Sequence, residues 1–499
     1  MRYLLLLWVL VFTLSPTIAQ EKARTIITTD GELDDVDSFI RMLLYANEFK
    51  IEGLVISSSQ WHYAGDGHGT KFTSELEMTK KMYGERTELR WPGNKWIYEL
   101  VDAYGAVYPN LKLHAPGYPK PEELKRLIRI GNIEFEGEME KETEGALLIK
   151  ERLLDDNLTP LYLQAWGGTN TIARALKSIE EEYINRPNWQ DIYQKVSKKA
   201  VIYTILDQDA TYKKYVSQKW PTIKIYYNEN QFWSFAYFWK RNVPPAMQKY
   251  MEGAFMGPKI ILNKGPLMAK YYSYGDGNPP LGEIDDIYSD PEKIKKNQWG
   301  SFTKYDFISE GDSPAFLHLV DMGLGNLENP NYGGWSGRLN LSPTVPNKWE
   351  DGKASAEYNP YTQKEDLSYA QTRWVADIQN DFAARASWCV NTYGEANHKP
   401  IITNKSGQSI FPTKAGKKVT LNLLATDPDF DPITFNYWFY KEASTGSQEP
   451  KIQLKKNGIC SVTIPKTAKS GETYHIIAEA KDSGEPNLKN YKRFIISIK

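Results

Sequence analysis

The sequence predicts an α/β fold, with a mostly parallel open sheet and helices on both faces, followed by a small all-β domain. From residue 24 to about residue 390, β-branched runs alternate with apolar residues at helical spacing. Beyond a polar stretch at 393–400, short alternating strands and turn residues take over. The 499 residues also exceed what one hydrophobic core usually serves. We therefore expect a main domain over 20–392, a linker over 393–400 and a sandwich domain over 401–499.

Residues 1–19 predict a secretory signal peptide. Arg2 supplies a basic start, residues 4–14 form a nearly unbroken apolar run, and residues 17–19 offer a small-residue cleavage site. No cysteine follows that site, so a lipid anchor is not expected there. The sequence contains no later run of about 18 apolar residues, so no membrane span is expected. We expect a periplasmic or extracellular protein.

Composition excludes some partners and leaves others open. The 61 Lys and Arg balance 62 Asp and Glu, whereas nucleic-acid binders usually carry a basic excess, so no nucleic acid is expected. Fifteen Trp and 32 Tyr are explained most simply by large cores and interfaces. Stacking of aromatic faces on sugar rings is the alternative. Cys389 and Cys460 are the only cysteines, and their spacing does not decide whether they pair.

The first elements of the main domain predict a βαβ unit. Residues 24–29 form a β-branched strand, residues 36–49 have apolar residues at helical spacing, and residues 51–57 form the next strand. The acidic loop at 30–35 then lies at the carboxyl end of the first strand. In open α/β sheets this edge is where ligands bind.

The same pattern continues along the chain. Further strands are expected at 161–165, 200–206 and 224–227, with a helix over 171–184. Acidic and amide residues follow several of these strands on the same inferred edge. The stretch 257–350, rich in Gly, Pro, Asn and Trp, predicts long loops around a site. Residues 367–390 predict a closing amphipathic helix.

The tail predicts a β-sandwich of about 100 residues. Its strands are expected at 418–424, 433–439, 474–480 and 493–498. Between them, Asp427, Asp429 and Asp431 resemble acidic turns that bind calcium between sandwich domains. An ordinary β-turn, with Asp and Pro at favoured positions, is the preferred interpretation.

The acidic loop carries the candidate chemistry. Asp30, Asp34 and Asp35 place three carboxylates within six residues, where they repel one another unless a positive charge compensates. A helix N-terminus supplies partial positive charge, but capping needs only one or two carboxylates. A hard divalent cation with oxygen ligands explains three better. An EF-hand is excluded, because its loop needs Gly at the sixth position and Glu at the twelfth. Here these positions would be Asp35 and Arg41.

The loop and helix start from Thr29 to Ile40 resemble the amino-terminal signature of the inosine-uridine nucleoside hydrolase superfamily. That signature is one Asp followed, after a few residues, by Asp-Asp opening a helix. Three more stretches agree in order, at 53–60, 159–173 and 310–317. With its trailing sandwich, the chain resembles a subgroup of exported, nucleoside hydrolase-like proteins with an immunoglobulin-like tail, described as cellulose-binding.

The resemblance implies a calcium ion (Ca2+) as cofactor. Asp34 and Asp35 are its expected ligands, joined by Asp312 and the backbone oxygen of Trp166. Asp30 is expected to touch both the metal and its water and to act as general base. Attack by water opposite the leaving group would invert the anomeric centre.

Candidate substrate contacts come from two sources. The resemblance suggests sugar-binding residues after the strands at 51–57 and 224–227. An ordinary polar loop explains the group after the second of these strands, residues 228–230, equally well. In the turn at 333–338, Trp335 is a candidate aromatic platform and Arg338 a candidate cationic clamp for a larger saccharide. The alternative is that this Gly-Trp turn packs a loop onto the core. The candidates are Gln60, Asn228, Glu229, Asn230, Trp335 and Arg338.

The chain departs from the resemblance at Gly311. Many nucleoside hydrolases have a histidine there, which helps a purine base to depart, and glycine cannot do this. Either another group supplies the proton or the leaving group is not a nucleobase. His62, Asp66 and His68 are alternative acids, although a polar surface loop is the expected interpretation for each.

We therefore expect a secreted calcium-dependent hydrolase of N- or O-glycosidic bonds that acts on a carbohydrate or glycoside. One alternative is a non-catalytic, cellulose-type carbohydrate-binding protein that uses the same metal site. Another is a periplasmic nucleoside hydrolase. The resemblance is also compatible with a homodimer.

Overall fold

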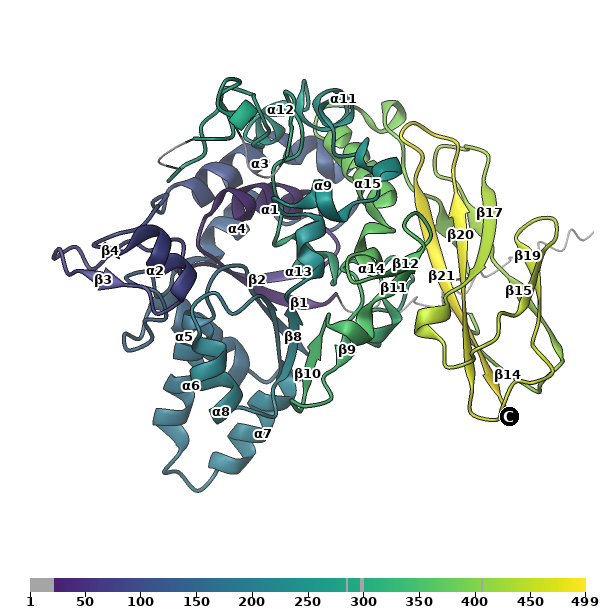
Figure 1. Ribbon diagram of the computed structural model, residues 1–499, viewed down its shortest axis with the longest axis horizontal. Coiled ribbons are helices and arrows are strands. Elements are labelled where there is room, and N and C mark those ends of the chain that lie inside the picture. The colour runs from purple at the N-terminus through teal and green to yellow at the C-terminus, as the bar shows by residue number, and fades with distance from the viewer. Residues whose placement is uncertain (1–21, 284–285, 297–299, 405–406) are drawn as a thin grey trace, which may run out of the picture.

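The computed structural model describes residues 22–283, 286–296, 300–404 and 407–499 (Figure 1). The expected signal peptide at 1–19 lies outside these ranges. Among the described residues, no helix has the length and apolar character needed to cross a membrane.

The main domain is built on one eight-stranded sheet with the strand order β5-β2-β1-β6-β7-β8-β10-β9. Neighbouring strands run parallel throughout, except that β9 is antiparallel to β10. The predicted mostly parallel open sheet is therefore confirmed. Its strands are β1 (Arg24–Thr29), β2 (Lys50–Ile56), β5 (Ile128–Ile130), β6 (Leu161–Ala165), β7 (Ala200–Ile205), β8 (Lys224–Asn228), β9 (Asn340–Leu341) and β10 (Lys348–Glu350).

Helices cover both faces of this sheet, and each face has its own core. On β1, Ile27 points into the core shared with α1 (Leu33–Leu44), α3 (Trp96–His114) and α15 (Val375–Trp388). Its neighbour Ile26 points into the opposite core, shared with α5 (Glu144–Leu154), α6 (Asn170–Tyr183) and α7 (Trp189–Lys199). Successive side chains of a strand alternate between faces, so every residue of β1 is buried.

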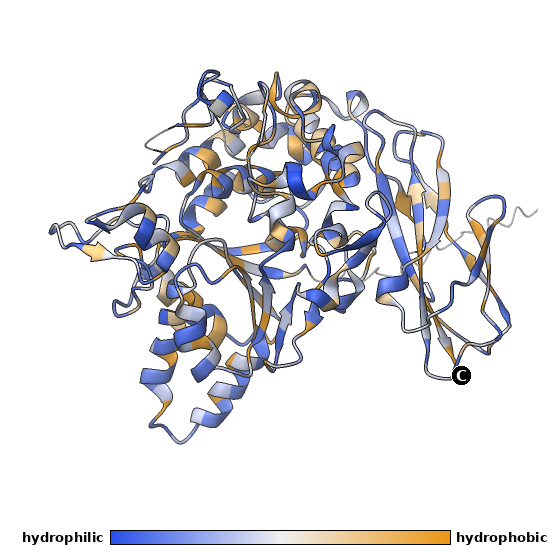
Figure 2. Cartoon of the chain, viewed as in Figure 1, coloured by the Kyte–Doolittle hydropathy of each residue, from blue (hydrophilic) through white to orange (hydrophobic). Residues whose placement is uncertain are grey.

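The figures show the same division. Figure 1 shows α1 and α3 on one side of the sheet and α5 and α6 on the other. Figure 2 shows hydrophobic residues concentrated along the sheet and hydrophilic residues on the outer turns of α6 and α7. The shorter elements of the main domain are β3 (Phe72–Thr73), α2 (Glu77–Tyr83), β4 (Glu85–Arg86), α4 (Pro121–Leu127), α8 (Ser217–Lys219), α9 (Trp239–Asn242), α10 (Pro245–Gln248), α11 (Gly253–Met256), α12 (Gly265–Met268), α13 (Ser313–Leu317), β11 (Glu357–Asn359), β12 (Lys364–Asp366) and α14 (Tyr369–Thr372).

Two expectations for the second half of the main domain need correction. The stretch 257–350 holds strands β9 and β10 in addition to loops and short helices. The predicted amphipathic helix over 367–390 is divided into α14 and α15. Helix α15 is not amphipathic, because nearly all its residues are buried. It packs on α1 and α3, while its Trp388 indole donates to the Asn397 carbonyl in the linker.

The tail is a small sandwich, as predicted. One sheet has the order β14-β21-β20-β17 and the other the order β15-β19-β18. Their inward residues form a separate core that includes Leu421, Val462, Ile476 and Phe494. The strands are β13 (Ile401–Ile402), β14 (Ile410–Thr413), β15 (Lys418–Asn422), β16 (Ala425–Thr426), β17 (Thr434–Phe439), β18 (Lys451–Leu454), β19 (Ile459–Thr463), β20 (Thr473–Lys481) and β21 (Lys489–Ile498).

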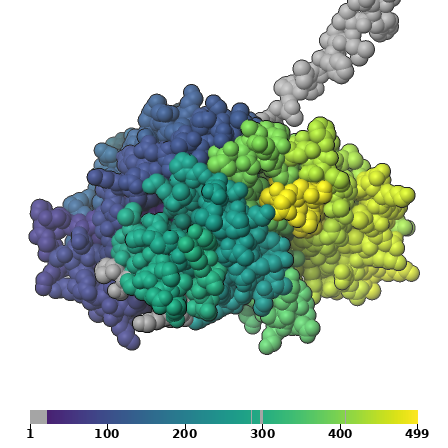
Figure 3. Space-filling model, turned by 90° about the horizontal axis from the view of Figure 1, so that it is seen from above, coloured from purple at the N-terminus to yellow at the C-terminus, as the bar shows by residue number. Residues whose placement is uncertain are grey.

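The segment between the domains is packed rather than free. His398 is buried, its ring stacks on Tyr393 with centroids 4.0 Å apart, and its backbone N–H donates to Asp429. Asp427 Oδ1 accepts from the backbone N–H groups of Asp429 and Asp431, which gives the turn preferred from the sequence. Seen from above, the yellow and yellow-green tail adjoins the green part of the main domain (Figure 3).

The two cysteines do not pair. Both Cys389 and Cys460 are free and buried. Cys389 belongs to the core of the main domain and Cys460 to the core of the tail.

The junction predicts a stability effect at Trp374, which precedes α15. Trp374 is buried and lies against Tyr491 and Trp438 of the tail, with ring centroids 5.6 and 6.0 Å away. We expect Trp374→Ala to lower the free energy of unfolding by about 3–5 kcal/mol, measured by urea denaturation. The exposed Tyr358 is the control, and Tyr358→Ala should change stability by less than about 0.5 kcal/mol. Equal effects of the two substitutions would contradict this packing role.

Candidate functional site

The acidic loop joins β1 to α1 at the carboxyl edge of the sheet. Asp30 follows the last residue of β1, and Asp34 and Asp35 lie in the first turn of α1. Asp30 and Asp35 are 1% and 2% exposed. Glu32 occupies the N-cap position, but its side chain makes no capping hydrogen bond. Helix capping therefore does not account for this concentration of acidic side chains.

Asp312 reaches the same place from the far end of the main domain. It is the N-cap of α13, and one oxygen each from Asp34, Asp35 and Asp312 lie within 4.8 Å of one another. Asp312 Oδ2 is buried without a hydrogen-bond partner. An all-oxygen donor set of carboxylates fits a calcium ion, which prefers oxygen ligands.

Gly311 makes this approach possible. A Cβ atom at position 311 would lie only 2.6 Å from Asp34 Oδ2. Any larger residue, including histidine, would have to displace the Asp34 carboxylate. The departure from the nucleoside hydrolase pattern is therefore built into the packing of the acidic cluster.

The carboxylates at the site oppose one another electrostatically. Burial, followed by the charges of Glu32 and Asp30, raises the pKa of Asp34 well above its ordinary value. Burial and neighbouring carboxylates raise the pKa of Asp35 and of Asp312 in the same way. Asp30 differs, because His62 and other polar neighbours outweigh burial and lower its pKa to about 2. Asp30 is thus the carboxylate held in its ionised form.

The turn after β6 borders Asp30. A Cβ atom at Gly167 would lie 2.8 Å from Asp30 Cγ, so only glycine fits there without a shift. The Trp166 carbonyl, the expected backbone ligand, accepts a hydrogen bond of 2.6 Å from the Gln208 side chain. A carbonyl oxygen has two lone pairs, so one remains for a cation. Gln208 was not singled out from the sequence, although it follows β7 among the polar residues at that edge.

A buried ion pair lies behind the site. Arg41 of α1 pairs with Glu310, and both side chains are fully buried. Tyr271 also donates to Glu310, and Gln379 of α15 accepts from Arg41 at 2.7 Å. Glu310 therefore points away from the acidic cluster. The pair ties the helix that carries Asp34 and Asp35 to the loop that carries Asp312.

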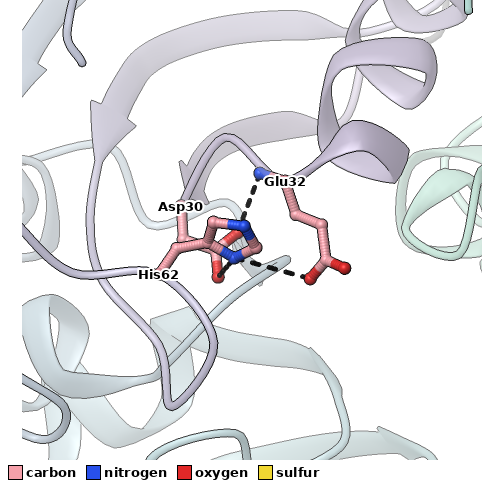
Figure 4. A group of neighbouring side chains, drawn as sticks. All are labelled: Asp30, Glu32 and His62. Atoms are coloured by element: carbon pink, nitrogen blue, oxygen red, sulfur yellow. Dashed lines mark hydrogen bonds and ion pairs between the residues drawn. The ribbon is translucent and has the colours of Figure 1, made fainter. Parts of the chain in front are cut away.

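His62 occupies an unexpected position. It is fully buried, and its Nδ1 lies 3.7 Å from Asp30 Oδ2 and 3.5 Å from Glu32 Oε2 (Figure 4). The surface-loop interpretation is wrong for His62, because its backbone bonds to Ser59 turn the chain inward after β2. Glu32 was overlooked in the sequence, although a carboxylate two residues after Asp30 in a strand-end loop was the available signal.

The surface-loop interpretation fits the other two candidate acids of this loop. His68 is exposed, and Asp66 accepts from the backbone N–H groups of His68 and Thr70. These bonds hold a local turn.

The candidate sugar-binding residues after β2 and β8 are engaged within the protein. Gln60 accepts from Thr79, and Asn228 bonds to Tyr203 and to the backbone of Phe232. The backbone N–H groups of Glu229 and Asn230 donate to Asp351, which follows β10. Phe232 is 3.4 Å from a Cβ placed at Gly311, so this segment borders the acidic cluster through its ring. Direct sugar contacts by these four residues stay a prediction.

Trp335 and Arg338 do not form an exposed platform and clamp. They are 2% and 3% exposed, so neither offers a free face to a saccharide. Arg338 pairs with the buried Glu357, which also accepts from Tyr440 of the tail. The tail therefore covers the turn at 333–338. The alternative interpretation, in which this Gly-Trp turn packs on the core, is the correct one.

The cluster predicts an unusual pH dependence of stability. Aspartates in the unfolded chain titrate near about pH 4, whereas Asp34, Asp35 and Asp312 keep protons to higher pH when folded. Above about pH 4 the folded state therefore binds more protons, and stability falls as pH rises. The lowered pKa of Asp30 acts only below this window.

We expect calcium to raise the melting temperature more at pH 7.5 than at pH 5, measured by scanning fluorimetry in chelator and in calcium. Asp312→Asn should weaken both the calcium effect and its pH dependence. A calcium effect that is equal at the two pH values would contradict the role of these carboxylates.

Gly311 predicts a steric effect on calcium binding. We expect Gly311→Ala to weaken binding at least about tenfold, or about 1.4 kcal/mol, because the added methyl group displaces Asp34. Isothermal titration calorimetry measures this. Gly394→Ala is the matched control, since a Cβ there meets no atom within 4 Å. Unchanged affinity in Gly311→Ala would show that Asp34 is not a ligand.

Known proteins share this architecture. Residues 24–339 match the family model described as "Cellulose-binding Sde182, nucleoside hydrolase-like domain". Residues 418–498 match "Cellulose-binding protein Sde0182, C-terminal domain". No curated protein matches the chain.

Solved structures agree at the level of fold. A nucleoside hydrolase-related hypothetical protein from Saccharophagus degradans, associated with carbohydrate metabolism, is 24% identical with a TM-score of 0.70, and the match covers 96% of this chain and 100% of that one. An inosine-guanosine nucleoside hydrolase matches at 10% identity and a TM-score of 0.33, over 74% of this chain and 98% of that one. The family model spans more than half of the sequence, and the chain therefore belongs to the Sde182 family of nucleoside hydrolase-like, cellulose-binding proteins.

Proposed function

We propose that this chain is an exported calcium-dependent hydrolase of N- or O-glycosidic bonds that acts on a carbohydrate, with Asp30 as general base. The observation that carries the proposal is the contrast within the acidic cluster. Asp34 and Asp35 at the start of α1 converge with Asp312 at the start of α13, whereas the pKa of the adjacent Asp30 is lowered to about 2. A group of ligands beside one ionised carboxylate suits metal-assisted hydrolysis.

The donor set fits calcium. Asp34, Asp35 and Asp312 would hold the ion, together with the free lone pair of the Trp166 carbonyl and one oxygen of Asp30. Calcium bound there would orient a water molecule and the hydroxyl groups of the sugar.

Asp30 would take the proton from the attacking water. Its Oδ2 is buried and has no hydrogen-bond partner, so the oxygen is free to accept. The water oxygen bonds to the anomeric carbon, and the glycosidic bond breaks with its electron pair passing to the leaving group. Attack from the side opposite the leaving group inverts that carbon. A carboxylate of low pKa is a weak base, so its contribution depends on close positioning.

A carbohydrate is the proposed substrate for three reasons. The family is described as cellulose-binding, and the Saccharophagus degradans protein is associated with carbohydrate metabolism. The sequence predicts export. Position 311 holds glycine, which cannot protonate a departing purine, and a Cβ atom there would crowd the Asp34 carboxylate.

A carbohydrate-binding protein without turnover is the second candidate. The family description favours it, because both domains are named for cellulose binding. In that case the same cation would anchor sugar hydroxyl groups directly, and Asp30 would serve only as a ligand.

The two candidate functions predict different effects of Asp30→Asn on hydrolysis. We expect hydrolysis of at least one member of an oligosaccharide and nucleoside panel in calcium, no hydrolysis in chelator, and a loss of about 10²–10⁴-fold in Asp30→Asn. Reducing-end and free-base assays measure this. Asp156→Asn is the control, because that side chain is fully exposed. Turnover that survives in Asp30→Asn excludes the mechanism, and tight saccharide binding without turnover supports the second candidate.

A further inference from the structure

The imidazole of His62 is buried without a hydrogen-bond partner. The side chain is 0% exposed, and neither Nδ1 nor Nε2 makes a hydrogen bond. A buried polar group left unsatisfied costs about 1–3 kcal/mol. The fold therefore holds this ring in place for an interaction that its protein neighbours do not supply.

Two carboxylate oxygens face Nδ1. Asp30 Oδ2 lies 3.7 Å away and Glu32 Oε2 lies 3.5 Å away, both too long for a hydrogen bond (Figure 4). Asp30 Oδ2 is also buried without a hydrogen-bond partner. One ligand atom from each of Asp30, Glu32 and His62 lies within 4.8 Å of the others.

The spacing of these atoms matches a metal site. A tetrahedral zinc ion about 2.1 Å from each ligand separates the ligands by about 3.4 Å, close to the two distances seen here. An imidazole nitrogen with two carboxylates suits zinc and similar transition ions, whereas calcium prefers oxygen alone. We propose that Asp30, Glu32 and His62 form a second cation site, for a transition-metal ion such as zinc, beside the proposed calcium site.

Neighbouring groups orient the ligands. Tyr237 donates to Glu32 Oε1 at 2.9 Å, which leaves Oε2 facing His62. The Glu32 backbone N–H lies 3.4 Å from Asp30 Oδ1, which leaves Oδ2 on the same side. Ser59 accepts from the His62 backbone and fixes the loop. Outer partners that fix each ligand in this way are typical of metal sites.

This site goes beyond the proposed function and shares Asp30 Oδ2 with it. A metal ion on that oxygen would prevent it from accepting the water proton, so the zinc-loaded and the hydrolytic states exclude each other. The competing explanation is a buried ion pair between a protonated His62 and the two carboxylates. The two explanations differ in metal content, which can be measured without any substrate.

Elemental analysis of the full-length, tag-free protein tests the proposal. The protein is stripped with chelator, equilibrated with calcium and zinc, and freed of unbound metal. We expect about one zinc per chain in the wild type, at least a tenfold loss in His62→Ala, and retention of calcium in that variant. Asp312→Asn should lose calcium and keep zinc. His68→Ala, an exposed histidine of the same loop, is the matched control and should keep both ions.

Three results would overturn the site. The first is the absence of zinc from the wild type, which the ion-pair explanation predicts. The second is an equal zinc content in His62→Ala and the wild type. The third is the absence of nitrogen coupling in the electron paramagnetic resonance spectrum of the wild type with one equivalent of copper. The last result needs no variant, so it decides the question even if His62→Ala does not fold. If the protein binds no zinc but its calcium binding and turnover depend on Asp312, the proposed function stands and only the second site is ruled out.

Discussion

The buried pair of Arg41 and Glu310 is the interaction on which the arrangement of the site depends. It joins α1, which begins with Asp34 and Asp35, to the loop that ends at Asp312. Removing either charge from a fully buried pair leaves the other uncompensated, which costs far more than the pair contributes. Gln379 and Tyr271 satisfy further atoms of the pair, so α15 and the loop after α12 are fixed by the same contact. Four segments far apart in sequence thereby converge behind the acidic cluster.

Much of the fold could be predicted from the sequence, for a physical reason. Strands β1, β6 and β7 are covered on both faces, so their mostly apolar or β-branched residues stand out from the helices between them. Strands β9 and β10 contain only two and three residues, too few for any periodicity to appear. The sequence predicted an amphipathic helix over 367–390, and the part that forms α15 contains Gln379, Asp381 and Arg385. These side chains are instead buried, and each also bonds to a residue of α1 or of its end, far away in sequence.

The candidate site was predictable where its residues are neighbours in sequence. Asp30, Asp34 and Asp35 are visible as mutually repelling charges in one loop. The approach of Asp312 followed from resemblance, because no local spacing links it to that loop. His62 was misjudged, since its surrounding Ser, Gly and Asp residues are typical of a surface loop. The turn at Ser59 reverses the chain and places the ring inside, and a sequence pattern does not record that direction.

The burial of α15 also affects how the chain is made. Because a ribosome synthesises the chain from its amino end, residues 401–499 follow all strands of the main sheet. During that interval Trp374 lacks the two tail rings, Tyr491 and Trp438, that cover it in the finished protein. Transiently exposed apolar surface of this kind promotes aggregation. The tail is therefore an intramolecular cover for the start of the last helix of the main domain, and its folding removes this exposed apolar surface.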